Sequence, residues 1–407
     1  FVRSKGGRKM GKTVKADVVI IGSGAIGNST AFYLSKEGLK VVVLDREQIA
    51  NSASVRNGAM NKLTRRGVGE LPIGVYGAHE VWPKVSEVTG IDMEYKQTGG
   101  YRIIMDDDDW NTTMRFEEEG KKAGLHFENM TGDELRKKTP QFSEKIKAAV
   151  RCEEESRANP LKVTLGFYSA AMKLGAEFYP GQEVDHLEIK KGRISAAVTT
   201  DGNRYEAEKI MVSAGFQSRK ILDTVGIDVP MYSFYEEIFV TEKLPWVLDE
   251  IFVGSYYGQQ TQCGTFVFGA SDGYCMYPDR AKFPQTYQTS TRLNSLAKGL
   301  VDLFPALAKA KIVRSWGGWM AISPDDSMMI GKVDEIPGLY LACGFSGHGF
   351  GLSAPVGKVM SEVIAEKEVG CDISKLRYDR FRKEMDVFLK KDRNDYNVNS
   401  IQRSWIY

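Results

Sequence analysis

The stretch from Ala16 to Arg46 constrains the fold of this chain more than any other part of the sequence. It opens with a nearly continuous apolar run, Val18 to Ile21, followed by three glycines at GxGxxG spacing, Gly22, Gly24 and Gly27. Such a run is typical of a strand that is buried on both faces of a parallel sheet. Glycines at this spacing permit a tight turn, a close approach of the backbone to a pyrophosphate, and packing of the next helix on the strand.

A second apolar strand is expected at Val41 to Leu44, and Asp45 follows it directly. This carboxylate lies about 20 residues past the glycines, where an acid accepts hydrogen bonds from a ribose hydroxyl in dinucleotide-binding folds. The order strand, turn, helix, strand and acid therefore predicts a dinucleotide site, with Ala25, Ile26 and Arg46 beside the glycines and the acid. The alternative is an ordinary βαβ unit with a glycine-rich turn.

Small and polar residues crowd the next segment, 51–67. Such residues let the chain lie against a cofactor and direct backbone N–H groups at phosphate, although a polar surface loop has a similar composition. Because the dinucleotide motif precedes this segment, we favour the cofactor interpretation. The expected contacts are Ala53, Ser54, Arg56, Asn57, Gly58, Ala59 and Met60.

The middle of the chain contains three expected strands, at 176–189, 193–200 and 204–213, separated by the turns KKG and TDGN. The last strand ends in an apolar run followed by small residues, so we expect it to return the chain to the first sheet. The cofactor contacts expected from this part are Val184, Ala214 and Gly215.

The segment 226–318 has a different pattern, with aromatic-rich strands expected at 232–242, 250–260 and 264–270. Apolar and polar positions alternate there, which is typical of an antiparallel sheet with one covered and one solvated face. Most tyrosines in such a sheet are half-buried structural residues, and one or two are expected to face a site. The candidates are Tyr256 and Tyr257.

A second glycine-rich loop follows the apolar run from Leu339 to Cys343, and a helix is expected to begin near Ala354 and Pro355. The positive end of that helix dipole would stabilise an anionic group such as a reduced flavin. The alternative is a glycine-rich turn that only packs. The expected cofactor contacts are Gly344, Ser346, Gly347, His348, Gly349 and Phe350.

The overall composition argues against several classes of protein. A net charge of +2 does not favour a nucleic-acid surface, and no run of about 18 apolar residues predicts a membrane span. The five cysteines lack CxxC spacing, which indicates reduced thiols in a cytoplasmic protein without an iron–sulfur or zinc site of its own. With four histidines in the chain, no multi-histidine metal site is expected.

Together, these motifs resemble the D-amino-acid-oxidase-like flavoprotein superfamily, in the branch of glycine oxidase, sarcosine oxidase, proline dehydrogenase and hydrogen cyanide synthase beta-type subunits. The resemblance covers most of residues 16–380. The residues that carry it are 22–27 with Asp45, Ser54 with 56–58, Ala214 and Gly215, 316–318 with 323–325, and 344–350. It implies noncovalent FAD and oxidation of the C–N bond of a small amine or amino acid (glycine, sarcosine, proline or opine-like) by hydride transfer to flavin N5.

The resemblance also implies an α/β fold with two parts. A doubly wound, Rossmann-like FAD-binding domain is expected from 16–97, 150–225 and 319–380, and an antiparallel-sheet substrate domain from 98–149 and 226–318. Residues 1–15 are expected to form a basic flexible leader, because they carry scattered lysines and arginines without an apolar period. Residues 381–407 are expected to form a C-terminal tail.

The chain departs from the family pattern at three positions. Met320 stands where glycine-oxidase-like members carry a carboxylate-binding arginine, and Gly351 where monomeric sarcosine-oxidase-like members carry a lysine. Gly318 stands at the flavin-attaching cysteine of the latter group, so covalent FAD is not expected. Two substrate classes stay open: an amino acid held by Lys62 or Arg65 with a tyrosine, and an amine without a carboxylate. The candidate catalytic residues are Lys62, Tyr256, Tyr257 and His348.

The route of the electrons after substrate oxidation also follows from the composition. Without a cysteine cluster, they must pass to oxygen, a diffusing acceptor or another chain. Because the familiar carboxylate anchors are missing, we favour a beta-type subunit of a dehydrogenase complex. The alternatives are a self-contained oxidase that produces peroxide, a nicotinamide-dependent dehydrogenase, and a non-catalytic flavin electron-transfer subunit.

Overall fold

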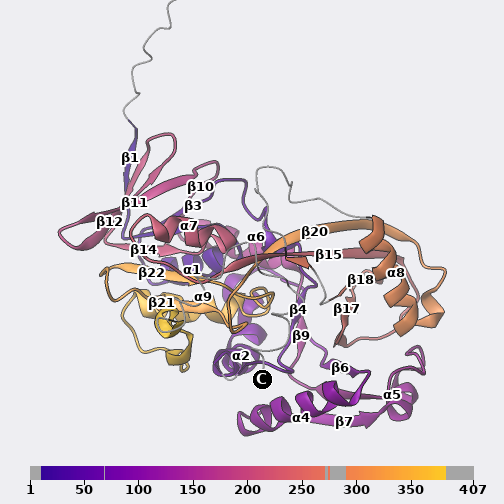
Figure 1. Cartoon of the computed structure of the whole chain (residues 1–407). Coiled ribbons are helices and arrows are strands. Elements are labelled where there is room, and N and C mark those ends of the chain that lie inside the picture. The colour runs from indigo at the N-terminus through magenta and orange to yellow at the C-terminus, as the bar shows by residue number, and fades with distance from the viewer. Residues whose placement is uncertain (1–10, 68, 271–273, 276–289, 382–407) are drawn as a thin grey trace, which may run out of the picture.

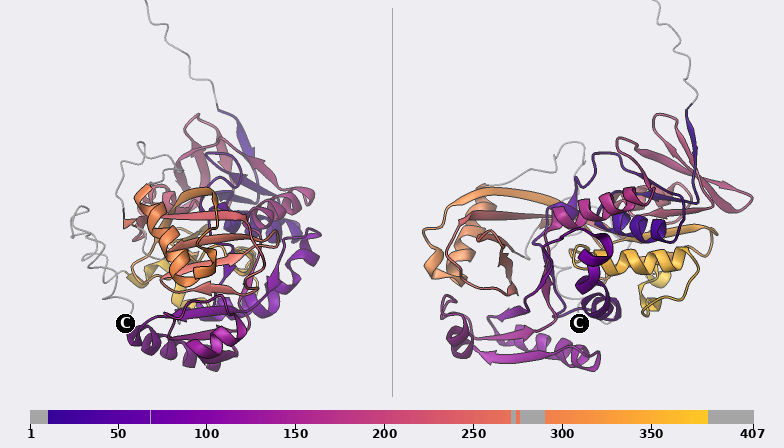
Figure 2. Two further views of the ribbon diagram at one scale, coloured as in Figure 1. Left: turned by 90° about the vertical axis from the view of Figure 1, so that its right-hand side faces the viewer. Right: turned by 180° about the vertical axis from the view of Figure 1, so that it is seen from behind.

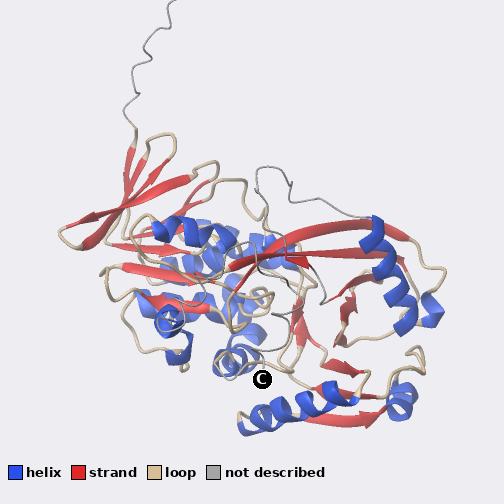
Figure 3. Cartoon of the chain, viewed as in Figure 1, coloured by secondary structure: helices blue, strands red, loops and turns tan. Residues whose placement is uncertain are grey.

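The computed structural model describes residues 11–67, 69–270, 274–275 and 290–381. Two large sheets dominate the molecule, and the paired strands β15 (Tyr232–Lys243) and β20 (Ile312–Ile322) extend from one toward the other (Figure 1). Helices gather around the first sheet, and α8 (Ser290–Leu303) lies at the far end of the second (Figure 3). Within the described residues, no helix has the length and apolar character needed to cross a membrane.

In the described part of the chain the first sheet has six strands, and two of its central strands, at Val18–Ile21 and Val41–Leu44, are apolar and buried at every position. Five strands are parallel, and the edge strand β21 is antiparallel to β22. Full burial on both faces explains the continuous valine and isoleucine runs. In spatial order the strands are β10 (Glu177–Tyr179), β3 (Val41–Leu44), β2 (Val18–Ile21), β14 (Lys209–Val212), β22 (Leu339–Cys343) and β21 (Met329–Lys332).

Different elements cover the two faces of this sheet. Val18 and Ile20 of β2 pack toward the helices α1 (Ala25–Lys36), α6 (Pro160–Lys173) and α9 (Ser353–Ile364). Val19 and Ile21 point to the other face, as alternation along a strand requires. That face is covered by α7 (Ser218–Asp223) and a small sheet, which extends from the upper end of the molecule (Figure 2). The small sheet is ordered β1 (Thr13–Lys15), β13 (Arg204–Glu206), β12 (Arg193–Thr199) and β11 (Val184–Lys190).

Three sequence expectations need correction in this part. The strand expected at 176–189 is two strands, β10 and β11, because Pro180 and the left-handed Gly181 interrupt it. The strand expected at 204–213 also divides, into β13 and β14, which belong to different sheets. Residues 13–15 of the expected flexible leader form β1 and pair in parallel with β13. Residues 1–10 of that leader, and 382–407 of the expected tail, lie outside the described residues.

The second sheet, as far as the structure describes the chain, has nine strands and is mostly antiparallel. One pair, β16 with β6, is parallel, which the alternating pattern did not reveal. Buried phenylalanines fill the space between the sheet and α8, including Phe252, Phe266, Phe268 and Phe304. Besides β15 and β20 it contains β6 (Gly100–Ile104), β7 (Phe127–Thr131), β8 (Ala148–Cys152), β16 (Ile251–Val253), β17 (Tyr256–Gln260), β18 (Thr265–Ala270) and β19 (Tyr274–Cys275), flanked by α4 (Asp107–Lys122) and α5 (Gly132–Lys138).

Smaller elements join the two sheets. Strands β4 (Met60–Asn61) and β5 (Lys96–Gln97) both pair with β9 (Ser156–Arg157). The helical segment 71–89 is divided into α2 (Leu71–Tyr76), a π turn at Gly77–Val81, a 3-10 turn at Trp82–Lys84 around Pro83, and α3 (Val85–Thr89). Strands β8 and β20 each continue across a predicted domain boundary, at 149/150 and 318/319, because their ladders are unbroken there.

Candidate functional site

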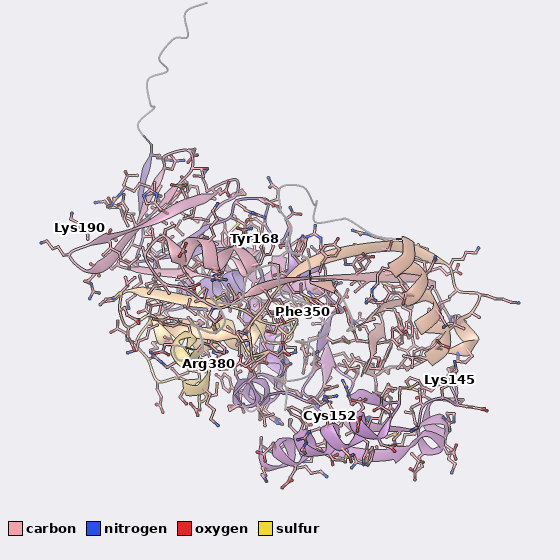
Figure 4. The ribbon with its side chains drawn as sticks, in the orientation of Figure 1. Lys145, Cys152, Tyr168, Lys190, Phe350 and Arg380 are labelled. Atoms are coloured by element: carbon pink, nitrogen blue, oxygen red, sulfur yellow. The ribbon has the colours of Figure 1, made fainter. Side chains whose placement is uncertain are left out.

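A cavity of about 960 Å³ lies between the carboxyl ends of the parallel strands and the second sheet. Ile21, Leu44 and Ser213 mark the strand ends on its wall. The alternate residues in the first part of β15, Tyr232, Phe234, Glu236 and Ile238, also line it. This is where open α/β sheets bind ligands, and the volume is at the upper end for small-molecule sites. Phe350, which lines the cavity, lies in the interior, whereas Lys145 and Lys190 lie at the periphery (Figure 4).

The first glycine-rich turn forms one end of the cavity. Gly22 has a φ of +108°, a left-handed conformation that side chains disfavour, and a Cβ there would lie 2.5 Å from the Ser213 carbonyl oxygen. A Cβ at Gly27 would lie 1.9 Å from the carbonyl oxygen of Gly22, so this glycine permits the close packing of α1 on the turn. Gly24 is the N-cap of α1 and lies on the cavity wall. The turn therefore presents backbone to whatever the cavity holds.

Asp45 closes the same end of the cavity. Its Oδ2 accepts a hydrogen bond from the N–H of Ser23 at 2.8 Å, and its Oδ1 accepts one from the N–H of Glu47 at 2.9 Å. Burial raises the pKa of Asp45, and the two backbone N–H groups oppose this by stabilising the charged form. A carboxylate has about four acceptor positions, so Asp45 can hold the loop and still accept hydroxyl donors from a ligand.

The segment 53–60 is held against the cavity from several sides. Ser54 Oγ accepts a hydrogen bond from the N–H of Ala25 at 2.9 Å, which ties this segment to the start of α1. Gln259 on β17 donates its Nε2 hydrogen to the carbonyl oxygen of Gly58 at 3.1 Å. A Cβ at Gly58 would lie 3.0 Å from the ring of Tyr257, so only glycine leaves room for that ring. The segment is thereby fixed to both sheets.

The second glycine-rich loop joins β22 to α9 and forms the middle of the cavity wall. Gly344, Ser346 and Gly347 all have left-handed φ values, of +69°, +47° and +79°. Ser346 tolerates its strained backbone because its Oγ accepts a hydrogen bond from the N–H of Ser323 at 3.1 Å. The loop therefore contributes glycine backbone to the cavity wall, together with residues such as His348 and Phe350.

His348 lies on this loop and contacts a buried charged pair that the sequence did not predict. Its Nδ1 lies 3.2 Å from Oε2 of Glu70, and the same oxygen accepts a hydrogen bond from Nη1 of Arg66 at 2.9 Å. Burial, reinforced by Lys62 and Arg66, lowers the pKa of His348 to about 4, so the ring is neutral at pH 7. Burial alone would raise the pKa of Glu70, but His348, Arg66 and the N–H of Met328 hold it at about 2.

Lys62 and Tyr257 face the other end of the cavity. Burial lowers the pKa of Lys62 to about 8, and the positive charges of Arg66 and Arg102 add to this effect. The Tyr257 hydroxyl donates a hydrogen bond to Oε2 of Glu236 at 2.9 Å. Burial and this carboxylate raise the pKa of Tyr257 well above its usual value, so the phenol stays protonated.

Most of the sequence-predicted residues line this one cavity, but three are placed differently. Gly27 and Ala59 are not on its wall. Tyr256 contributes to the wall, yet its ring stacks on Phe268 with centroids 5.3 Å apart, on the side of the sheet that faces α8. The predicted residues on the wall are Gly22, Gly24, Ala25, Ile26, Asp45, Arg46, Ala53, Ser54, Arg56, Asn57, Gly58, Met60, Lys62, Val184, Ala214, Gly215, Tyr256, Tyr257, Gly344, Ser346, Gly347, His348, Gly349 and Phe350.

Sequence reasoning missed several polar residues of the site. Arg102 on β6 and Asp326 after β20 line the cavity, and burial raises the pKa of Asp326 to about 6. Glu236 was also missed, although its place in the alternating pattern of β15, two residues from Phe234, was a usable signal.

Comparison with known proteins assigns the family. Residues 17–363 match the DAO family of FAD-dependent oxidoreductases. The chain belongs to this family. It is 23% identical to an opine oxidase subunit of Rhizobium meliloti over 90% of this chain and 98% of that protein. It is also 23% identical to the hydrogen cyanide synthase subunit HcnC of Pseudomonas aeruginosa, over 90% and 97%. The crystal structure of L-proline dehydrogenase from P. horikoshii superposes with a TM-score of 0.83 at 24% identity, over 92% of this chain and 99% of that chain.

Membership confirms the predicted family, the α/β fold with a Rossmann-like FAD domain, and FAD as the cofactor of this enzyme. The residues present fit the cofactor. The glycine turn leaves backbone exposed where a pyrophosphate needs close approach, and Asp45 keeps acceptor positions for ribose hydroxyls. The described residues on the cavity wall include no cysteine, and a Cβ at Gly318 would only touch the side chain of Arg56.

Proposed function

We propose that this enzyme oxidises the C–N bond of a small amino acid as the beta-type subunit of a dehydrogenase complex, with FAD bound noncovalently. When bound, FAD supplies the redox chemistry by accepting a hydride from the carbon next to nitrogen. The observation that carries the proposal is the continuity of one cavity from Asp45 and the glycine turn to the polar end at Lys62 and Tyr257. We propose that the predicted cofactor contacts on this wall bind FAD. We also propose an FAD-binding part and a substrate part with the boundaries that the sequence predicts, except that β8 and β20 belong wholly to the substrate part.

Lys62 is proposed as the group that takes the proton from the substrate ammonium. An amine with a pKa of about 8 is partly neutral at physiological pH and is therefore able to accept a proton. Tyr257, oriented by Glu236, is proposed to donate a hydrogen bond to the substrate, and His348 to lie beside the flavin ring. Because the ring of Tyr256 packs on Phe268, we do not retain Tyr256 as a catalytic residue.

Arg102 is proposed to bind the substrate carboxylate, in place of Lys62 or Arg65. Arg102 lines the cavity, and its Nη2 donates a hydrogen bond to Asp109 Oδ1 at 2.7 Å. Its buried Nε has no hydrogen-bond partner within the described part of the chain. A buried guanidinium donor of this kind is suited to a carboxylate. Met320, which stands where glycine-oxidase-like proteins carry a carboxylate-binding arginine, contributes an uncharged side chain to the cavity wall.

The names of two relatives, which are subunits of an opine oxidase and of a hydrogen cyanide synthase, support the subunit role. Each matches the chain over nearly its whole length, so the chain corresponds to one subunit of such an assembly. We therefore propose a partner subunit that receives the electrons.

The proposed function is tested by anaerobic addition of amino acids, and of the amines that lack their carboxylates, to the purified holoprotein. We expect flavin bleaching with an amino acid, a KM raised at least about tenfold in Arg102→Met, and no change in the exposed control Arg115→Met. Stopped-flow mixing of the reduced protein with air should give slow reoxidation that an artificial dye accelerates. Millisecond reoxidation with stoichiometric peroxide would identify a self-contained oxidase instead.

A further inference from the structure

A second, very small cavity adjoins the site on the other side of Lys62. Its volume is about 10 Å³, which is the room that one water molecule needs. Lys62 lines both this cavity and the large one. The other polar groups on the small cavity's wall include Asn61, Arg66 and Glu154.

Two buried polar atoms make this cavity a built site for water. Asn61 Oδ1 and Arg66 Nε are both without a hydrogen-bond partner among the described residues. Their side chains are fixed by other contacts, since Asn61 Nδ2 donates to Ser156 Oγ at 3.0 Å and Arg66 Nη1 donates to Glu70 at 2.9 Å. One acceptor and one donor on the wall of a one-water cavity provide two of the two to four polar partners that a buried water needs.

Glu154 lines this cavity and also contacts a residue at the surface of the protein. Its side chain is only 5% exposed, and its Oε1 lies 2.5 Å from Nδ1 of His126, whose side chain is 71% exposed. The N–H of His126 also donates to Glu154 Oε2 at 3.1 Å, which fixes the carboxylate in place. Hydrogen bonding and charge from Glu154 raise the pKa of His126. The buried carboxylate thus has the small cavity on one side and a solvent-exposed base on the other.

We propose that Lys62, one water, Glu154 and His126 form a path by which the substrate's proton leaves the site, an inference that rests on the proposed function. An amine enters as the ammonium ion and must lose a proton before hydride leaves its carbon. The substrate N–H bond breaks and an N–H bond forms on neutral Lys62. That proton then passes to the water, to the Glu154 carboxylate, to His126 and to solvent, without any transfer of electrons. The charged groups around Lys62 are Arg66, Arg102, Glu155 and Glu236, with Asp326 on the same wall.

The decisive variant is Glu154→Gln, which keeps an acceptor for the His126 N–H and removes the site that carries the proton. At pH 7 we expect anaerobic flavin reduction by the substrate to slow at least about tenfold, with a new solvent deuterium isotope effect above about 2. Glu154→Asp should restore most of the rate. The neighbouring exposed acid provides the matched control, since Glu153→Gln should match wild type.

A second readout does not depend on activity. A high-resolution crystal structure of the holoprotein should show a water within hydrogen-bond distance of Asn61 Oδ1 and Arg66 Nε. Absence of that water, or a Glu154→Gln variant that reduces its flavin at the wild-type rate with no isotope effect, would overturn the path. A wild-type flavin that no amine or amino acid reduces would instead reject the proposed function.

Discussion

Asp45→Ala is expected to weaken FAD binding far more than it weakens the fold. The carboxylate would contribute a charge-assisted hydrogen bond to the ribose, and such bonds are worth about 1.5–3 kcal/mol. At about 1.4 kcal/mol for each factor of ten, the dissociation constant of FAD should rise roughly 10- to 150-fold. The change also releases the N–H groups of Ser23 and Glu47, so the apoprotein should lose a further, smaller amount of stability.

The assay is titration of apoprotein with FAD, followed by flavin fluorescence, alongside a urea unfolding curve of each apoprotein. Asp17 provides a matched control, because its Oδ2 also accepts a backbone hydrogen bond in the same sheet, from the N–H of Lys40 at 2.7 Å. It lies at the opposite, amino end of β2 and away from the cavity, so Asp17→Ala should leave FAD affinity unchanged. If the dissociation constants of the two variants agree within about twofold, Asp45 does not hold the ribose.

Four further outcomes are expected. Acid precipitation of the holoprotein should release all of the yellow colour to the supernatant, and colour in the pellet would show a covalent bond. Gly27→Ala should lower the melting temperature and FAD affinity, because the new Cβ would lie 1.9 Å from the Gly22 carbonyl oxygen; an unchanged melting curve would contradict this packing. Glu70→Gln should destabilise the protein by about 3–5 kcal/mol in urea unfolding at pH 7, because it leaves Arg66 without its buried anion. Since the folded pKa of Glu70 is depressed to about 2, its contribution is present above pH 4.5 and should be lost as pH falls toward 2, which unfolding curves across that range would detect. His348→Ala should shift the flavin spectrum or potential with the fold intact, and identical spectra and potentials would leave His348 a structural residue.

Elements set by local sequence were predictable. Strand β2, the glycine turn and α1 are consecutive in the sequence, and the residue types in each are explained by its own local structure. It was also predictable that Tyr256 and Tyr257 face opposite sides of the sheet, since adjacent residues on a strand do so. The sequence could not predict which of the two rings faces the cavity, because this depends on the face of the sheet on which α8 packs.

The charged partners of His348 and Lys62 were not predictable, although Lys62 and Asp45 themselves were, because distant segments bring these partners together. Glu70 contacts His348, which lies more than two hundred residues later in the sequence. Glu155 accepts hydrogen bonds from the backbone N–H groups of Leu63 and Thr64, which lie beside Lys62 but far from Glu155 in the sequence. No period or motif links such positions in sequence. Burial in the folded protein, rather than residue type, also sets the pKa of Lys62 near 8.

The alternation of β15 along the cavity has a practical consequence for changing what the enzyme accepts. Positions 232, 234, 236 and 238 share one face of a strand whose register is fixed by pairing with β20 from Tyr232 to Thr241. A library of substitutions confined to these four positions would reshape the far wall while leaving both glycine loops untouched. Because the wall is built on paired strands rather than on a mobile loop, new side chains would meet the substrate from known directions. Under the proposed division of the cavity, such substitutions would change substrate preference and leave the cofactor contacts in place.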